Sequence, residues 1–101
     1  MFSLVCSAQI IAEARNGPCH LTAEGEGLIF TVHVDGLSPG ESLSLKSISN
    51  GESLTNSAKA RPDGSYGVTL LPAVEGKSSG KVTISVKSSR CQLQITFPWH
   101  N

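Results

Sequence analysis

Residues 31–45 read "TVHVDGLSPGESLSL" and contain a turn between two segments in which apolar and polar residues alternate. Val32 and Val34 precede the turn on one parity, as is typical of a strand with one dry face. Pro39 fixes φ near −65° and Gly40 supplies the positive φ of a type II turn. Leu37 is expected to anchor the turn in the core. The stretch therefore predicts a structural corner between two strands, and the alternative is a ligand-binding loop.

The same period of two continues along the chain, and no segment shows helical spacing over three turns. Turn-forming stretches such as "NGP" at 16–18 and "RPDGS" at 61–65 interrupt it. We predict about seven or eight short strands, over roughly residues 3–13, 19–23, 27–35, 42–49, 53–60, 65–71, 81–87 and 90–97. This regular spacing is typical of an all-β sandwich or a small barrel.

The apolar parity of these strands also predicts which side chains form the core. The predicted core residues are Leu4, Ile10, Leu28, Phe30, Val32, Val34, Leu37, Leu45, Val68, Leu70, Val82, Ile84, Val86, Leu93, Ile95 and Phe97.

The corner resembles the strand–GLxPG–strand corner of fibronectin type III and bacterial immunoglobulin-like domains. The resemblance implies a single immunoglobulin-like β-sandwich over residues 1–101, with about seven to eight mostly antiparallel strands. In those domains the Leu plugs the end of the sandwich and the Pro-Gly turns the chain to the opposite sheet. Here Ser42 and Leu43 stand where fibronectin modules usually place a Tyr, and four strands follow the corner. These departures favour the bacterial immunoglobulin-like type.

The chain contains three cysteines, which is an odd number for a disulfide framework. In an immunoglobulin-like sandwich the first and last strands commonly lie side by side, so Cys6 and Cys19 are both candidates to reach Cys91. If the protein is exported, we expect Cys19–Cys91 with Cys6 as a buried thiol. The alternative is three reduced thiols.

Composition and charge argue against several classes of partner. The formal net charge is zero and charged residues make up 16% of the chain, so no basic excess points to nucleic acid. Acidic residues concentrate in residues 1–57 and basic residues in 58–101. This polarity cancels if the two halves interleave in space, and otherwise it can guide head-to-tail contact. No apolar run approaches the ~20 residues of a membrane helix, so we expect no membrane insertion.

Catalytic, cofactor and metal sites are not expected. The histidines and cysteines lack zinc spacing, since Cys19 and His20 are adjacent and point to opposite faces of a strand. His33 and Asp35 share a strand face, but a lone His–Asp pair on such a face is weak evidence for catalysis. Residues 36–40, "GLSPG", have the G-x-S-x-G spacing, but they lie in the predicted corner between two strands. A nucleophile elbow needs a strand-to-helix turn, so none is expected here.

Few aromatic side chains are available for binding. Pro98 is expected to end the last strand at Phe97, which leaves Trp99 just beyond it. Trp99 then either folds back over the end of the core, which we favour, or forms a contact surface with Tyr66 and His100.

Taken together, these features predict a non-catalytic structural or protein-interaction module of an exported bacterial protein, located outside the cell or in the periplasm. A protein partner is expected, without nucleic acid, and the sequence does not indicate the oligomeric state. The alternatives are a small-ligand or carbohydrate-binding β-sandwich and an accessory domain of an enzyme.

Overall fold

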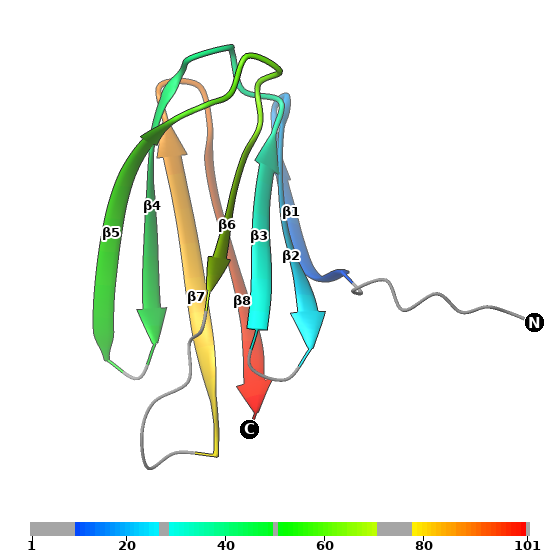
Figure 1. Ribbon diagram of the computed structural model, residues 1–101, viewed down its shortest axis with the longest axis vertical. Helices are drawn as coiled ribbons and strands as arrows, with labels where there is room; N and C mark the ends of the chain where they lie inside the picture. The colour runs from blue at the N-terminus through cyan, green and yellow to red at the C-terminus, as the bar shows by residue number, and fades with distance from the viewer. Residues whose placement is uncertain (1–9, 27–28, 50, 71–77, 101) are drawn as a thin grey trace, which may run out of the picture.

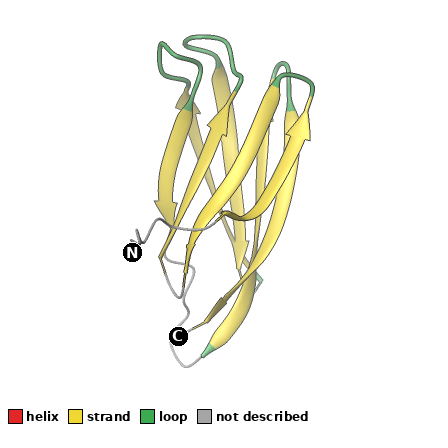
Figure 2. Cartoon of the chain, turned by 90° about the vertical axis from the view of Figure 1, so that its right-hand side faces the viewer, coloured by secondary structure: helices red, strands yellow, loops and turns green. Residues whose placement is uncertain are grey.

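The computed structural model describes residues 10–26, 29–49, 51–70 and 78–100, and these residues form strands and turns without a helix (Figures 1 and 2). The strands are β1 (Ile10–Asn16), β2 (Cys19–Glu26), β3 (Ile29–Asp35), β4 (Ser42–Ser49), β5 (Glu52–Lys59), β6 (Tyr66–Leu70), β7 (Ser79–Ser88) and β8 (Gln92–His100). None of the described residues belongs to a helix long and apolar enough to cross a membrane.

The strands form two four-stranded sheets that face each other across the core. One sheet has the order β1-β2-β3-β6 and is called here the β1 sheet, and the other has the order β5-β4-β7-β8 and is called the β5 sheet. Every strand pair is antiparallel. The connection from β3 to β4 crosses between the sheets, so residues 35–41 turn the chain from one sheet to the other (Figure 1). The all-β, immunoglobulin-like sandwich predicted from the sequence is confirmed.

The core lies between the sheets and follows the predicted parity at most positions. Phe30 of β3 and Phe97 of β8 meet across it with ring centroids 4.9 Å apart. The predicted residues that are buried are Phe30, Val32, Val34, Leu37, Leu45, Val82, Ile84, Val86, Leu93, Ile95 and Phe97. Val68 and Leu70 are partly buried against this cluster, and Leu4 and Leu28 lie outside the described residues. The core also contains Cys19, Leu21, Ala23, Leu43, Ala60, Cys91 and Trp99, which the predicted set did not include.

Ile10 is a wrong prediction, because its side chain is 53% exposed. A β-bulge between Ile10 and Ala12 shifts the register of β1 against β2. A bulge inserts one extra residue and reverses the face on which the preceding side chains lie. Ala12 packs on the core while Ile10 points outward. The expected end of this strand at residue 13 is also wrong, since β1 continues to Asn16.

The last strand ends three residues later than predicted, at His100. Pro98 lies within β8 and is paired with Lys81 of β7. Because β8 is at the edge of its sheet, it has only one hydrogen-bonded neighbour strand, and an edge strand tolerates a residue without an N–H. Trp99 is therefore a strand residue, not a residue beyond the sandwich.

Candidate functional site

Four connections gather at one end of the sandwich, at the top of Figure 1, and are called here the disulfide end. They are the β1–β2 turn at 17–18, the β3–β4 corner at 36–41, the β5–β6 loop at 60–65 and the β7–β8 turn at 89–91. In the corner, the N–H of Glu41 donates to the C=O of Ser38 at 3.0 Å. Gly40 has φ of 73°, so Pro39 and Gly40 form the centre of a type II turn.

Leu37 is the apolar anchor of this corner and is 6% exposed. Its N–H donates to the C=O of Gly64 in the β5–β6 loop at 3.0 Å. The N–H of Gly40 donates to the C=O of Ala60 at 3.1 Å, so the corner and that loop hold each other. These contacts give residues 37–40 a structural role, and they favour the corner over the ligand-loop alternative.

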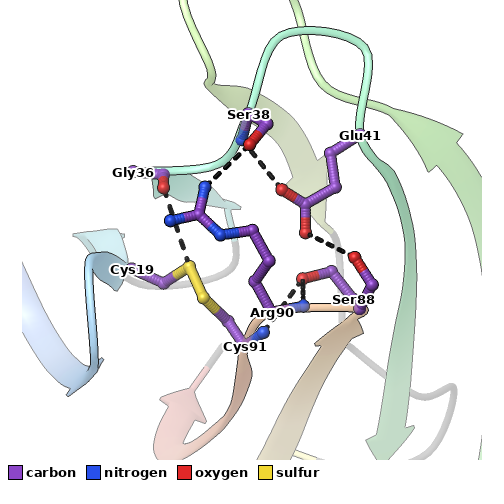
Figure 3. Close-up of a disulfide and its surroundings, with 8 residues drawn as sticks. Cys19, Gly36, Ser38, Glu41, Ser88, Arg90 and Cys91 are labelled. Atoms are coloured by element: carbon purple, nitrogen blue, oxygen red, sulfur yellow. Dashed lines mark hydrogen bonds between the residues drawn. A yellow bond between two sulfur atoms is a disulfide. The ribbon is translucent and has the colours of Figure 1, made fainter.

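A disulfide joins Cys19, the first residue of β2, to Cys91, the residue before β8 (Figure 3). The two Cα atoms are 6.3 Å apart, and both residues are buried. Sγ of Cys19 lies 3.9 Å from the carbonyl oxygen of Gly36, a packing contact because a bonded sulfur has no proton to donate. The bond covalently links the two sheets. Cys6 lies outside the described residues.

Glu41 and Arg90 connect the corner to the β7–β8 turn above this disulfide (Figure 3). The N–H of Ser38 donates to Oε1 of Glu41 at 2.8 Å, and Nη1 of Arg90 donates to Oγ of Ser38 at 2.7 Å. The Ser88 hydroxyl, the Ser38 N–H and the Arg90 charge together lower the pKa of Glu41. The Ser89 hydroxyl also lies 3.5 Å from Oε2 of Glu41. The Glu41 carboxylate therefore accepts hydrogen bonds from both the corner and the β7–β8 turn.

The β5–β6 loop contains a second network of the same kind. The hydroxyl of Ser65 donates to Oδ1 of Asp63 at 2.6 Å and accepts from Nη1 of Arg61 at 3.2 Å. Hydrogen bonding from the Ser65 hydroxyl is the main cause that lowers the pKa of Asp63. Arg61 and Asp63 thus hydrogen-bond within their own loop, whereas Glu41 and Arg90 bridge two connections.

The structure does not bring Trp99, Tyr66 and His100 together. Tyr66 begins β6 opposite Val34, at the disulfide end, whereas Trp99 and His100 finish β8 at the other end (Figure 1). Trp99 is 1% exposed, in agreement with the favoured prediction that its ring packs on the core, so the ring is not exposed to act as a contact residue. Its ring packs against Gly80, where an added Cβ would lie 2.8 Å from Nε1 of the indole. The glycine provides the space that this ring fills.

Two histidines lie beside carboxylates on the outer face of the β1 sheet, and each contact is an ion pair only when the imidazole is protonated. Nε2 of His20 lies 3.0 Å from Oε1 of Glu13, and Nε2 of His33 lies 3.7 Å from Oδ2 of Asp35. Both pairs lie on a strand face, outside the core. Among the described residues there is no group of three or more His, Cys, Asp or Glu side chains arranged to hold a metal ion.

The four edge strands of the two sheets differ in how they are protected. Edge strands expose unpaired backbone groups and are usually blunted by bulges, prolines, charges or short length. β1 has the bulge after Ile10, β8 contains Pro98, and the described part of β6 has five residues. β5 has eight residues and an unbroken register with β4. Its charged residues, Glu52 and Lys59, stand at its two ends.

Comparisons with known proteins support the fold alone. A solved structure of a DUF3244 family protein from Bacteroides vulgatus, described as an immunoglobulin-like β-sandwich, superposes with a TM-score of 0.54. The two sequences are 12% identical, and the match covers 94% of this chain and 99% of the other. No family model matches the sequence, and no curated protein matches it. The chain is an immunoglobulin-like β-sandwich, similar to a bacterial domain of unknown function.

Proposed function

We propose that this chain is a non-catalytic protein-interaction module of an exported bacterial protein, and that a partner segment binds it by adding a strand to β5. The observation that carries the proposal is the unprotected β5 edge. Between Glu52 and Lys59 the strand reads Ser-Leu-Thr-Asn-Ser-Ala, without a charge, a proline or a bulge. Strand addition uses such an edge, because main-chain hydrogen bonds give affinity and alternate side chains give specificity.

The exposure of β5 supports the same proposal. Every residue of β5 except Ala58 is exposed, and Leu54 is 61% exposed. In Figure 1 the strand forms the outer margin of the sandwich, away from the β1 sheet. An added strand would therefore reach both its backbone and the side chain of Leu54.

The disulfide supports export. Disulfides form and persist in oxidising compartments, and Cys19–Cys91 is consistent with an extracytoplasmic location. We assign the domain to the periplasm or the cell exterior. When the protein is taken from its native cells and denatured without reductant, thiol alkylation should then leave Cys19 and Cys91 unmodified until a reductant is added. Alkylation of both without reductant would contradict export.

The binding test requires a defined segment. A photo-crosslinking residue at Asn56 would capture the partner from the envelope fraction of native cells, and the crosslinked segment would be synthesised as a peptide. We expect this peptide to protect the amides of β5 from hydrogen exchange. Protection confined to the loops of the disulfide end would contradict strand addition.

A matched pair of variants distinguishes binding at the β5 edge from nonspecific binding to exposed apolar side chains. Leu54→Lys places a charge on the edge, and Ile29→Lys changes a residue with nearly the same exposure, 59% against 61%, on the inner strand β3. We expect Leu54→Lys to weaken peptide binding by about tenfold, since lysine is a natural device against edge pairing. Ile29→Lys should bind like the parent, and equal losses would argue against the β5 site.

A further inference from the structure

The outer face of the β5 sheet is basic. Lys46 of β4, Lys59 of β5, and Lys81 and Lys87 of β7 are all exposed and alternate with residues that pack on the core. Serine, threonine and glutamine occupy most of the other outward positions. Within the described residues of this sheet, no outward position holds Asp or Glu.

These lysines are available to a ligand. None of them forms an ion pair within the described part of the chain, where the ion pairs are those of His20 and His33. Polar neighbours on the same face instead pair with one another, as Thr83 does with Thr96 at 3.0 Å and Ser85 with Gln94 at 3.2 Å.

Two adjoining open hollows lie on this face between the lysines. The first has a volume of about 660 Å³ and is flanked by Lys59 and Lys87, with Ser42, Ser44 and Ser57 in its lining. The second has a volume of about 470 Å³ and is flanked by Lys46 and Lys87. Ser44 and Lys87 line both, so the hollows form one groove across the strands, called here the lysine groove.

The strand register places the ammonium groups along this groove. Ser44 is the cross-strand partner of Lys87, and Ser85 is the partner of Lys46. Lys46 and Lys87 are therefore diagonal neighbours, about 7–8 Å apart at their Cα atoms. Serines lie beside them in the lining of both hollows. Lysines are the only charged residues in the lining of either hollow.

We infer that the lysine groove binds an acidic polysaccharide, with carboxylate or sulfate groups on Lys46, Lys59 and Lys87. Serine hydroxyls in the groove and the amides of Gln92 and Gln94 are suited to the hydroxyl groups of the sugar rings. Single-stranded nucleic acid is disfavoured, because it binds through stacked aromatic side chains and no outward position in the described strands of this sheet holds Phe, Tyr or Trp.

The outer face of the β1 sheet, on the opposite side of the molecule, is mainly acidic. Glu13, Glu24 and Asp35 occupy outward positions on the β1 sheet, with Arg15 as a basic neighbour. The acidic strands β1 to β3 thus stay together in one sheet, and the charge separation seen in the sequence is retained in space. A polyanion would be repelled from that face and attracted to the lysine groove. Glu41 lies near the first hollow, because its carboxylate contacts Ser89, which lines that hollow. The positive charge of Arg90 lies close to this carboxylate and opposes its negative charge.

Titration calorimetry at physiological ionic strength tests the assignment with four probes: heparin, polygalacturonate, neutral dextran and oligodeoxythymidylate. We expect binding of heparin or polygalacturonate and none of dextran. Lys87→Gln should weaken binding by about tenfold, the factor for loss of one charge-assisted hydrogen bond. Lys81→Gln is the matched control, since it removes the same charge from the same strand and face but outside the groove.

Three outcomes would overturn the proposal. They are the absence of binding to both acidic polysaccharides, equal losses from Lys87→Gln and Lys81→Gln, and binding of oligodeoxythymidylate as tight as that of the polysaccharides. Because all the lysines changed are exposed, unchanged melting temperatures of both variants would show that any loss of binding is local. The test does not involve strand addition at β5, so its result is independent of that proposal.

Discussion

The two ends of the sandwich are closed by different physical means. At the disulfide end, the Cys19–Cys91 bond and backbone hydrogen bonds between the corner and the β5–β6 loop hold the sheets together. At the other end, called here the tryptophan end, the described closure is the packing of Trp99 on Gly80. The disulfide end is therefore held by a covalent bond and directional hydrogen bonds. The tryptophan end is held by buried apolar surface and close packing.

The difference predicts how each end responds to substitution. Directional contacts fail when the backbone cannot adopt its angle or reach its partner, so small changes at glycines matter most there. Packing fails in proportion to the volume removed, and it tolerates a change of similar shape.

The largest effect is expected from Gly36→Ala at the disulfide end. Gly36 has φ of 87°, and an added Cβ would lie 1.8 Å from the carbonyl oxygen of Pro18, so the backbone of the β1–β2 turn must move. We expect a loss above about 4 kcal/mol in the free energy of unfolding, measured by chemical denaturation. Gly40→Ala is the control in the same corner, because its φ is 73° but no atom lies within 4 Å of the added Cβ. It should cost about 1–2 kcal/mol, and equal losses would refute the steric argument.

The second prediction concerns the disulfide. The bonded cysteines are 72 residues apart, and closing a loop of that length stabilises a fold by about 4 kcal/mol in the chain-entropy model. The double variant Cys19→Ala/Cys91→Ala should lose about this amount. Addition of a reductant should destabilise the parent and leave the double variant unchanged. If the parent melts at the same temperature with and without reductant, the bond does not hold this end.

At the tryptophan end, Trp99→Ala should cost about 3–4 kcal/mol, within the range for removal of a large buried aromatic side chain. Gly80→Ala tests the contact itself, because its added methyl group would meet the indole. It should destabilise the parent and have little effect in the Trp99→Ala background. Additive losses in this double-mutant cycle would show that the two residues are not coupled.

The same contrast explains how much could be predicted from the sequence. The eight strands and the corner follow from local signals. Pro39 and Gly40 predict the turn, and the alternating valines predict which face of each strand is buried. Ile10 was placed on the wrong face because nothing in the local alternation indicates the bulge that reverses it.

The tryptophan end was less predictable because its determinants are remote. Pro98 indicated the end of a strand, but its tolerance depends on β8 being an edge, which is a property of the sheet order. Trp99 fits because Gly80 lies opposite it, 19 residues earlier in the chain. The β5 edge and the lysine groove were missed for the same reason, since each requires knowing which strands are neighbours.

The smallest effect is expected for Trp99→Phe, which separates the ring's apolar area from its polar atom. Nε1 of Trp99 is buried and has no hydrogen-bond partner in the described structure. An unsatisfied buried donor costs about 1–3 kcal/mol, whereas replacing indole by phenyl loses only part of the buried area. The gain and the loss oppose each other, so we expect a change within about 1 kcal/mol, against about 3–4 kcal/mol for Trp99→Ala. A loss for Trp99→Phe as large as that for Trp99→Ala would mean that the indole N–H finds a partner in solution, and the tryptophan end would then rely on a directional contact as the disulfide end does.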